Sequence, residues 1–292
     1  MAIVKGTASE FSDDNVLTLS AALAYYAIFS LGPVLTIVVA LAGSAFGSDD
    51  VRTHIHQAVQ SMVGDSSAKA VDSMMAARQQ GATTVMKVIA IASLLFGATG
   101  VFGQLQTSLN IIWGVKSKPG RGVWTFIRNR FLSFGMVLGI AFLLLVSLAL
   151  SVVLAAFTAE VGKDLPAGIL IGRAFDFGFS FVVITVLFAM IFKVLPDVRV
   201  PWSKVWVGAI GTSLLFTLGK YLLGLYLGRA STASAYGVAG SVIIVLLWVY
   251  YASVILFLGA EFTQIYAKQT GAKVKPTEYA VASVKMEVAH TK

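Results

Sequence analysis

LLFTLGKYLLGLYLGR, residues 214–229, is an apolar run that carries a single lysine, Lys220, near its middle. Apolar residues continue on its N-terminal side to about residue 204, so the whole stretch has the roughly 20 residues that a helix needs to cross a hydrocarbon core. A stretch of this length predicts a membrane-spanning helix. It then raises the question of what compensates a charge inside the membrane.

The composition of the whole chain also indicates a membrane protein. Hydrophobic residues make up 57% of the 292 residues and charged residues make up 12%, with a mean hydropathy of +0.83. This charged share is about half that of soluble domains, which is too small to cover a soluble surface. The chain contains no cysteine, which excludes disulfides and thiolate metal sites.

Six apolar stretches are long enough to cross a membrane, and helices are expected because backbone groups in lipid must be satisfied within the segment. The predicted fold is therefore all-α, a polytopic helical bundle formed by residues 1–267. A polar tail at 268–292 follows, which we expect to be disordered. The predicted spans are approximately 20–46, 86–112, 126–157, 174–195, 204–228 and 238–265.

Lysine and arginine residues indicate the orientation of the bundle, because the cytoplasmic loops of membrane proteins carry more of them. With the N-terminus in the cytoplasm, fourteen of the 22 lie on the inner side and seven on the outer side. Both termini are therefore expected in the cytoplasm. The first residues do not have the pattern of a cleavable signal peptide, so we expect the first span to be retained.

The segment 48–85 is the long connection on the predicted outer side. It contains apolar residues at helical spacing, most regularly in its first half. This pattern predicts two short amphipathic helices. They either lie on the outer membrane surface or pack over the bundle as a lid without lipid contact. The apolar residues of the first half are Val51, Ile55, Ala58, Val59 and Met62.

Small and polar residues share one face of the predicted fifth span. At 100° per residue, an arc of about 80° contains Ser213, Thr217, Lys220, Gly224 and Gly228. We call this set the polar face. Leucines lie on the opposite side, so the polar face is predicted to contact other helices and not lipid.

The charge of Lys220 is costly inside a membrane. A central lysine costs about 3 kcal/mol on insertion scales, and the leucines of the span offset this cost. Lys220 lies about 13 Å below the predicted outer end of the span at Arg229. At this depth the predicted acidic partner is Asp176 of the fourth span. Lys220 either forms a structural pair or snorkels to the interface, or the polar face and Asp176 bind substrate.

Proline and glycine residues in the first two spans predict bends or close packing. Pro33 removes a helix hydrogen bond, so it is either a packing kink or a gating hinge. Gly97, Gly100 and Gly103 recur every three residues. They either let neighbouring helices approach closely or break the helix beside a cavity. No Gly-Lys-Ser/Thr sequence follows them, which excludes a phosphate-binding P-loop.

Other charged and titratable residues do not form a recognisable chemical site. Glu261 lies near the inner end of the sixth span, and we expect Lys193 and Lys204 to be its neighbours at the membrane interface. His54 and His56 are two residues apart, which places them on different sides of a helix and is not zinc-binding spacing. We expect no catalytic residues, metal site or cofactor. Nucleic-acid binding is not expected either, because membrane topology explains the basic loop.

Four long strings form a composite pattern: SAALAYYAIFSLGP (20–33), QTSLNIIWGV (106–115), FKVLPDVRVPWSKVWVGAIGTSLLFTLGKYLLGLYLGR (192–229) and SAYGVAGSVIIVLLWVYYASVILFLGAEF (234–262). In these strings the chain resembles the bacterial YihY/BrkB family of inner-membrane proteins. The resemblance implies a six-span helical fold in the inner membrane and a role in envelope maintenance. It also implies a link to lipid or lipopolysaccharide transport and to serum resistance, as in some relatives. Some members carry the name ribonuclease BN, but this sequence shows no nuclease site.

These observations lead to a transport hypothesis. We expect the chain to move an amphiphilic envelope substrate such as phospholipid, with membrane lipids as partners, and not to act as an enzyme. Lys220 would attract a phosphate head group, while Pro33 and the Gly97–Gly103 region would permit movement. One alternative is a non-transporting scaffold that recruits envelope proteins through segment 48–85 or the inner face. Another is an ion or small-solute carrier, which the shortage of membrane carboxylates disfavours.

Overall fold

The computed structural model of the chain describes residues 2–30, 48–63, 68–69, 71–72, 100–118, 166–229, 238–272 and 274–283. Most of these residues are helical, in agreement with the predicted class. Contacts divide the chain into two units. The first unit comprises Met1–Glu10, Leu109–Leu215 and Gly259–Lys292, and the second comprises Phe11–Ser108 and Phe216–Leu258.

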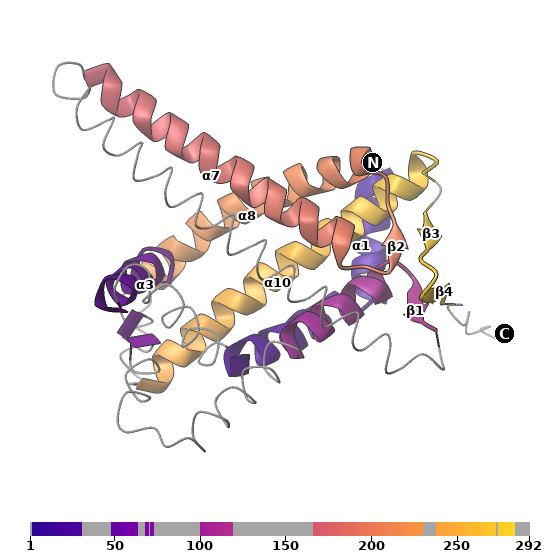
Figure 1. Ribbon diagram of the computed structural model, residues 1–292, viewed down its shortest axis with the longest axis horizontal. Helices are drawn as coiled ribbons and strands as arrows, with labels where there is room; N and C mark the ends of the chain where they lie inside the picture. Colours follow the sequence, from indigo (N-terminus) through magenta and orange to yellow (C-terminus); the bar gives the residue numbers. More distant parts are fainter. Residues whose placement is uncertain are drawn as a thin grey trace. The chain divides into compact units, whose positions relative to one another are not determined.

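Among the described residues, three helices are long and apolar enough to cross a membrane. They are α7, Pro166–Val194, α8, Trp202–Arg229, and α10, Val238–Gln269 (Figure 1). Their apolar windows coincide with the predicted fourth, fifth and sixth spans. These windows are Phe177–Val194, Trp202–Leu223 and Val242–Gln269.

The other predicted spans are described only in part. Val16–Ser30 is a shorter apolar helix that includes the start of the predicted first span. Residues 100–112 are helical and include the end of the predicted second span. The predicted third span, 126–157, lies outside the described residues, so the number of six spans stays a prediction.

Two further helices lie outside the predicted spans. α1, Ala2–Asp13, belongs with the end of α10, where Glu10 Oε1 lies 3.8 Å from Lys268 Nζ. α3, Ser48–Val63, falls in the segment for which the sequence predicts two amphipathic helices. The location of this segment at an outer membrane surface stays a prediction.

In the first unit, two glycine–threonine pairs hold α8 and α10 close together. Gly208 of α8 faces Thr263 of α10, and Gly259 of α10 faces Thr212 of α8. A Cβ atom at either glycine would overlap the threonine side chain opposite. The hydroxyl groups of Thr212 and Thr263 donate hydrogen bonds to the glycine carbonyls four residues earlier, at 2.7 and 2.6 Å. Small residues therefore let two antiparallel helices approach while their hydroxyl groups stay satisfied.

In the second unit, α8 and α10 contact each other through aromatic side chains. Gly219 of α8 lies against the hydroxyl end of Tyr251 of α10. The ring of Phe216 packs edge-on against Trp248, with ring centroids 6.3 Å apart. The side of α8 that carries Phe216 and Gly219 is therefore its packed side in this unit.

The last described residues form two small antiparallel sheets in the first unit (Figure 1). β3, Lys275–Pro276, pairs with β2, Val198–Arg199, which lies between α7 and α8. β4, Ala280–Ala282, pairs with β1, Val115–Ser117. Further backbone hydrogen bonds flank both sheets. The end of the chain is thus attached to two separate loops.

This order corrects the expectation of a disordered tail for the described residues between 268 and 283. α10 continues to Gln269, beyond the predicted end of the sixth span, and the strands then pair with loop backbone. Val198 and Ala280, one from each sheet, are buried. A polar composition favours disorder, but pairing with an exposed strand edge can order such a segment. Residues 284–292 lie outside the described residues.

Replacing Ala280 with aspartate is expected to release β4 from β1. The Ala280 residue is 4% exposed, and burying a carboxylate there is costly. A loss of about 1.4 kcal/mol raises the open population about tenfold. Limited proteolysis should therefore show chymotrypsin cleaving after Tyr279 about tenfold faster. The control is Val281→Asp, because Val281 is the neighbouring strand residue and is exposed. Equal cleavage of both variants would contradict this account.

Candidate functional site

Exposure increases along the three described side chains of the polar face of α8. Ser213 is fully buried, Thr217 is half-buried and Lys220 is exposed. Ser213 and Lys220 point within about 20° of each other around the helix, because seven residues complete almost two turns. The difference in exposure therefore arises along the helix and not around it.

The prediction that Lys220 faces neighbouring helices stays a prediction, since the described structure shows only that the residue is exposed. The residue beside it, Gly219, makes the contact with Tyr251 of α10. Gly219 points about 100° away from Lys220 around the helix. A helical wheel groups residues into faces, but it does not show which face is packed. Near Lys220, the packed side of α8 is the one that carries Gly219.

Exposed apolar side chains precede and follow Lys220 in the sequence of α8, and the two leucines among them point to the opposite side of the helix. Leu218, Tyr221 and Leu222 are 57%, 68% and 54% exposed. An exposed ammonium group on an apolar helix offers a partner to the acidic head group of an amphiphile. This surface of α8 is the candidate substrate-binding site.

The position of Lys220 along α8 can be compared with the thickness of a membrane. The apolar window of α8 begins at Trp202, and Trp202 and Trp206 are both exposed, as is typical of residues at a membrane interface. Eighteen residues of helix separate Trp202 from Lys220, which corresponds to about 27 Å. A hydrocarbon core is about 30 Å thick. With Trp202 at one interface, Lys220 lies near the opposite boundary of the core.

Of the remaining residues of the predicted substrate site, the structure describes the side chain of Thr217 but not those of Gly224 and Asp176. The Oγ1 atom of Thr217 is buried and has no hydrogen-bond partner in the described part of the chain. Gly224 lies within α8 and Asp176 within α7, but their side chains lie outside the described residues. The predicted pair of Lys220 and Asp176 therefore stays a prediction.

The structure describes two of the four predicted hinge residues, and these two differ in how closely they are packed. Pro33 and Gly97 lie outside the described residues. Gly100 lies against the ring of Tyr26 in the second unit, where a Cβ atom would overlap the ring. Gly103 has open space at the position of a Cβ atom. Close packing therefore explains Gly100 but not Gly103.

A buried polar cluster in the first unit was not predicted from the sequence. Asn110 donates a hydrogen bond from Nδ2 to Asp197 Oδ2 (3.0 Å) and accepts one at Oδ1 from the Asp197 backbone N–H (2.8 Å). Gln264 of α10 donates from Nε2 to the carbonyl oxygen of Ile112 (2.6 Å). Asn110, Asp197 and Gln264 are all buried. The sequence feature that could have indicated this cluster is the polar string QLQTSLN (104–110) at the end of the predicted second span, which includes Asn110.

The charged residues predicted near the inner membrane surface also lie in the first unit. Glu261 of α10 is fully buried. Lys193 Nζ lies 5.5 Å from the ring centroid of Trp202, and Lys204 Nζ lies 5.1 Å from that of Tyr266. Aromatic rings therefore attract both ammonium groups. The proximity of these lysines to Glu261 stays a prediction.

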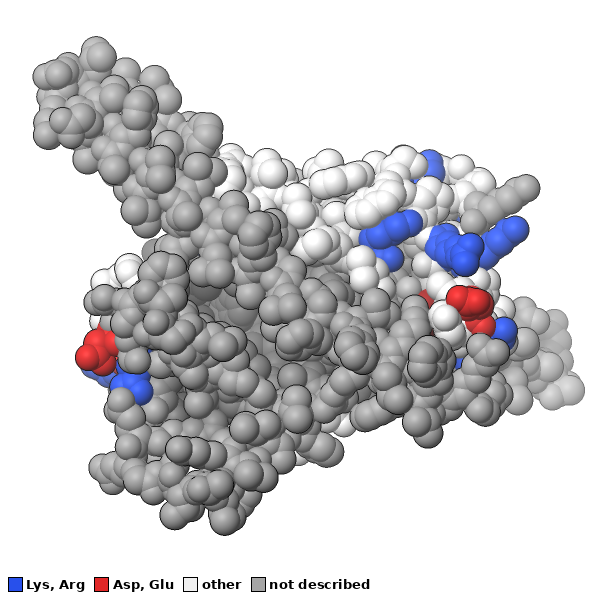
Figure 2. All heavy atoms as spheres, in the orientation of Figure 1, with Lys and Arg blue, Asp and Glu red and all other residues white. Residues whose placement is uncertain are grey.

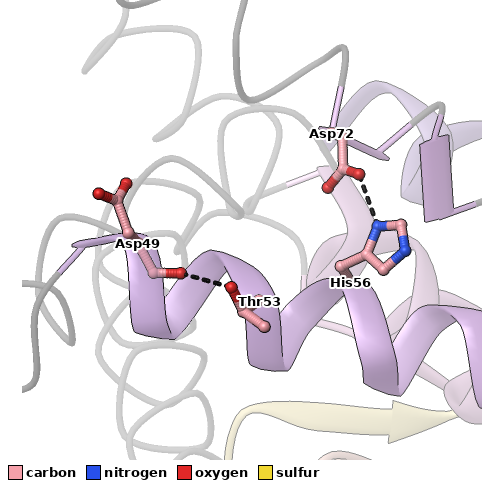
Figure 3. A network of polar contacts seen from close by, with 4 residues as sticks. All are labelled: Asp49, Thr53, His56 and Asp72. Atoms are coloured by element: carbon pink, nitrogen blue, oxygen red, sulfur yellow. Dashed lines mark hydrogen bonds and ion pairs between the residues drawn. The ribbon is translucent and has the colours of Figure 1, made fainter.

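The segment after Ser48 contains a histidine–aspartate hydrogen bond in the second unit (Figure 3). His56 Nδ1 of α3 lies 2.6 Å from Asp72 Oδ2, and the Thr53 hydroxyl donates to the Asp49 carbonyl at 2.9 Å. The pair connects α3 to the helical residues 71–72. Within the described parts of the chain, no three histidine, aspartate or glutamate residues are placed to hold a metal ion.

Comparison with known proteins assigns this chain to a family. The sequence profile of a family described as Virulence factor BrkB matches residues 7–282, nearly the whole chain. The chain belongs to the BrkB family. This result confirms the resemblance of the four sequence strings.

Relatives of this BrkB-family chain are named UPF0761 membrane proteins. The relative from Verminephrobacter eiseniae is 29% identical over 87% of the chain and 59% of its own length. The relatives from Chromobacterium violaceum and Pseudomonas aeruginosa (strain LESB58) are 27% identical over 85% and 87% of the chain, and over 58% and 60% of their own lengths. The chain thus spans about three fifths of these relatives. No solved structure matches it.

Proposed function

We propose that this BrkB-family membrane protein transports an amphiphilic envelope substrate, such as a phospholipid, across the bacterial inner membrane. The observation that carries the proposal is the exposure of Lys220 on a face of α8 that is buried seven residues earlier. The exposure of this residue gives a head group access to a cation within an apolar helix. Both termini lie in the cytoplasm in this proposal, which the bias of lysine and arginine supports.

The chemistry of this surface supports a substrate with a phosphate head group. An ammonium group forms charge-assisted hydrogen bonds to phosphate oxygens, and these are stronger than neutral hydrogen bonds. Tyr221, which points about 100° from Lys220 around the helix, is exposed and offers aromatic surface to an acyl chain. With Trp202 at one membrane interface, Lys220 lies near the depth at which phospholipid head groups meet their chains.

Lys220→Met is expected to slow phospholipid scrambling by about tenfold or more in vesicles that contain the purified protein. A charge-assisted hydrogen bond contributes about 1.5–3 kcal/mol, which corresponds to a factor of about ten or more in rate. Dithionite quenching of a fluorescent phospholipid measures this rate. Removing a charge from an apolar helix favours membrane insertion, so the variant is expected to fold.

Two further variants make this test specific. Lys220→Arg keeps a positive charge at the same depth and should retain most of the activity. Lys116→Met removes an exposed lysine of β1 and should leave scrambling unchanged. If Lys220→Met scrambles lipid at the rate of the unmodified protein, the transport proposal fails in favour of a scaffold. Currents that depend on a small solute would favour the carrier.

A further inference from the structure

Two cations lie directly opposite each other in the small sheet formed by β2 and β3. Arg199 of β2 is the register partner of Lys275 of β3, and both residues are exposed. Directly opposed residues of an antiparallel pair point to the same face, with Cβ atoms about 5 Å apart. We call Arg199 and Lys275 the cationic pair. In the described part of the chain, no ion pair involves either residue.

Like charges that oppose each other across two strands destabilise the pairing. The sheet of β2 and β3 is nevertheless fixed by its surroundings. Val198 and Val200, on either side of Arg199, are buried. Thr277 N–H, just after β3, donates a hydrogen bond to the Asp197 carbonyl at 2.9 Å. The protein therefore holds two positive charges together on a fixed backbone, an arrangement that an anion between them would stabilise.

A third cation strengthens the positive charge of this region. Lys193, at the end of α7, donates a hydrogen bond to the carbonyl oxygen of Val200, the residue after Arg199. Its ammonium group therefore lies beside β2. Figure 2 shows lysine and arginine side chains gathered on the surface where Figure 1 places β2 and β3, with acidic atoms close by.

The cationic pair is positioned at the level of a membrane surface. The apolar window of α7 ends at Val194 and that of α8 begins at Trp202, so β2 lies in the turn between two segments that are long enough to cross a membrane. Trp202 and Trp206 are exposed, and their rings lie 6.3 Å apart. Exposed tryptophans are typical of the head-group region, which is where lipid phosphates lie.

We propose that the cationic pair, with Lys193 beside it, binds the phosphate of an anionic phospholipid at this surface. The two side chains would each donate hydrogen bonds to phosphate oxygens, which replaces their mutual repulsion with attraction to one shared anion. Trp202 and Trp206 would contact the lipid at the level where its glycerol and acyl chains begin. This site is independent of Lys220 and of the proposed transport function, because it concerns a lipid held at the turn between α7 and α8.

Native mass spectrometry of the full chain in neutral detergent tests this proposal. The protein is titrated with short-chain phosphatidylglycerol, with short-chain phosphatidylcholine, or with inorganic phosphate. We expect about tenfold tighter binding of phosphatidylglycerol than of phosphatidylcholine. The double variant Arg199→Gln, Lys275→Gln should lose this preference. Lys116→Gln should keep it, because the register partner of Lys116 is the apolar Val281.

Thermal unfolding provides a second readout that separates binding from misfolding. Without lipid, Lys275→Gln should raise the unfolding midpoint by about 1–3 °C, because it removes the repulsion with Arg199. With phosphatidylglycerol, the variant should gain less stability than the unmodified protein. A double variant that still prefers phosphatidylglycerol overturns the proposal. Displacement of the lipid by millimolar inorganic phosphate also overturns it, since the ligand would then be a soluble phosphate.

Discussion

Gly208→Ala is expected to destabilise the protein, whereas Gly211→Ala, three residues further along α8, is expected to stabilise it. A Cβ atom at Gly208 would overlap Oγ1, Cβ and Cγ2 of Thr263, while one at Gly211 would make only an ordinary contact of 3.9 Å with Phe262. Overpacking costs about 1–3 kcal/mol. Alanine gains about 1 kcal/mol over glycine in a helix, and only Gly211→Ala keeps this gain.

The threonine opposite Gly208 has little freedom to move away. Thr263 is fully buried, and its hydroxyl donates a hydrogen bond to the Gly259 carbonyl. Rotation of the side chain would break this bond and bury an unsatisfied hydroxyl group. The same argument applies to Thr212 opposite Gly259, so the two pairs form one reciprocal contact.

Unfolding of both variants in detergent, monitored by fluorescence, shows whether each substitution raises or lowers the free energy of unfolding. The double variant Gly208→Ala, Thr263→Gly removes the three atoms that the new Cβ would meet, and it should recover part of the loss. Non-additivity of this size is expected only for residues in direct contact. Equal stability of Gly208→Ala and Gly211→Ala would show that α8 and α10 are not packed as closely as described.

The long helices could be predicted from the sequence because their signal is local. Continuous apolar runs place spans at 174–195, 204–228 and 238–265, and the structure has helices at Pro166–Val194, Trp202–Arg229 and Val238–Gln269. Length and hydropathy decide such segments without reference to the rest of the chain. The differences lie at the helix ends, where capping and tertiary contacts decide the boundary.

The strands at the end of the chain could not be predicted, since their pairing depends on distant segments. Lys275–Pro276 combines a charged residue with a proline and has no strand signal of its own, and its partner Val198–Arg199 lies before α8. Ala280–Ala282 likewise pairs with Val115–Ser117. Strands of two or three residues fall below the length at which alternation can be recognised.

The candidate substrate site shows what a helical wheel can establish. The wheel places Ser213, Thr217 and Lys220 on one side of α8. It does not say how far along the helix that side is packed, which depends on the partner helix. The exposure of Lys220 thus required the structure.

Asn110→Ala is expected to lower the free energy of unfolding by about 3 kcal/mol or more. The variant removes both hydrogen bonds to Asp197, one to a carboxylate oxygen and one from a backbone N–H, in a region where both residues are buried. Losing a partner of a buried charged group costs about 1.5–3 kcal/mol, and the backbone N–H adds about 1 kcal/mol. Unfolding by denaturant in detergent measures the loss.

The size of this effect follows from what Asn110 connects. It joins the helix at 100–112 to the turn before β2, two segments that are 87 residues apart. Gln104→Ala, on the same helix, loses a single neutral hydrogen bond to Ser108 and should cost only about 1 kcal/mol. The exchanged pair Asn110→Asp, Asp197→Asn keeps one amide and one carboxylate, so it should be more stable than Asn110→Asp alone. If the exchange gives no recovery, the two side chains do not contribute as a pair, and the turn that carries Arg199 is held by its other contacts.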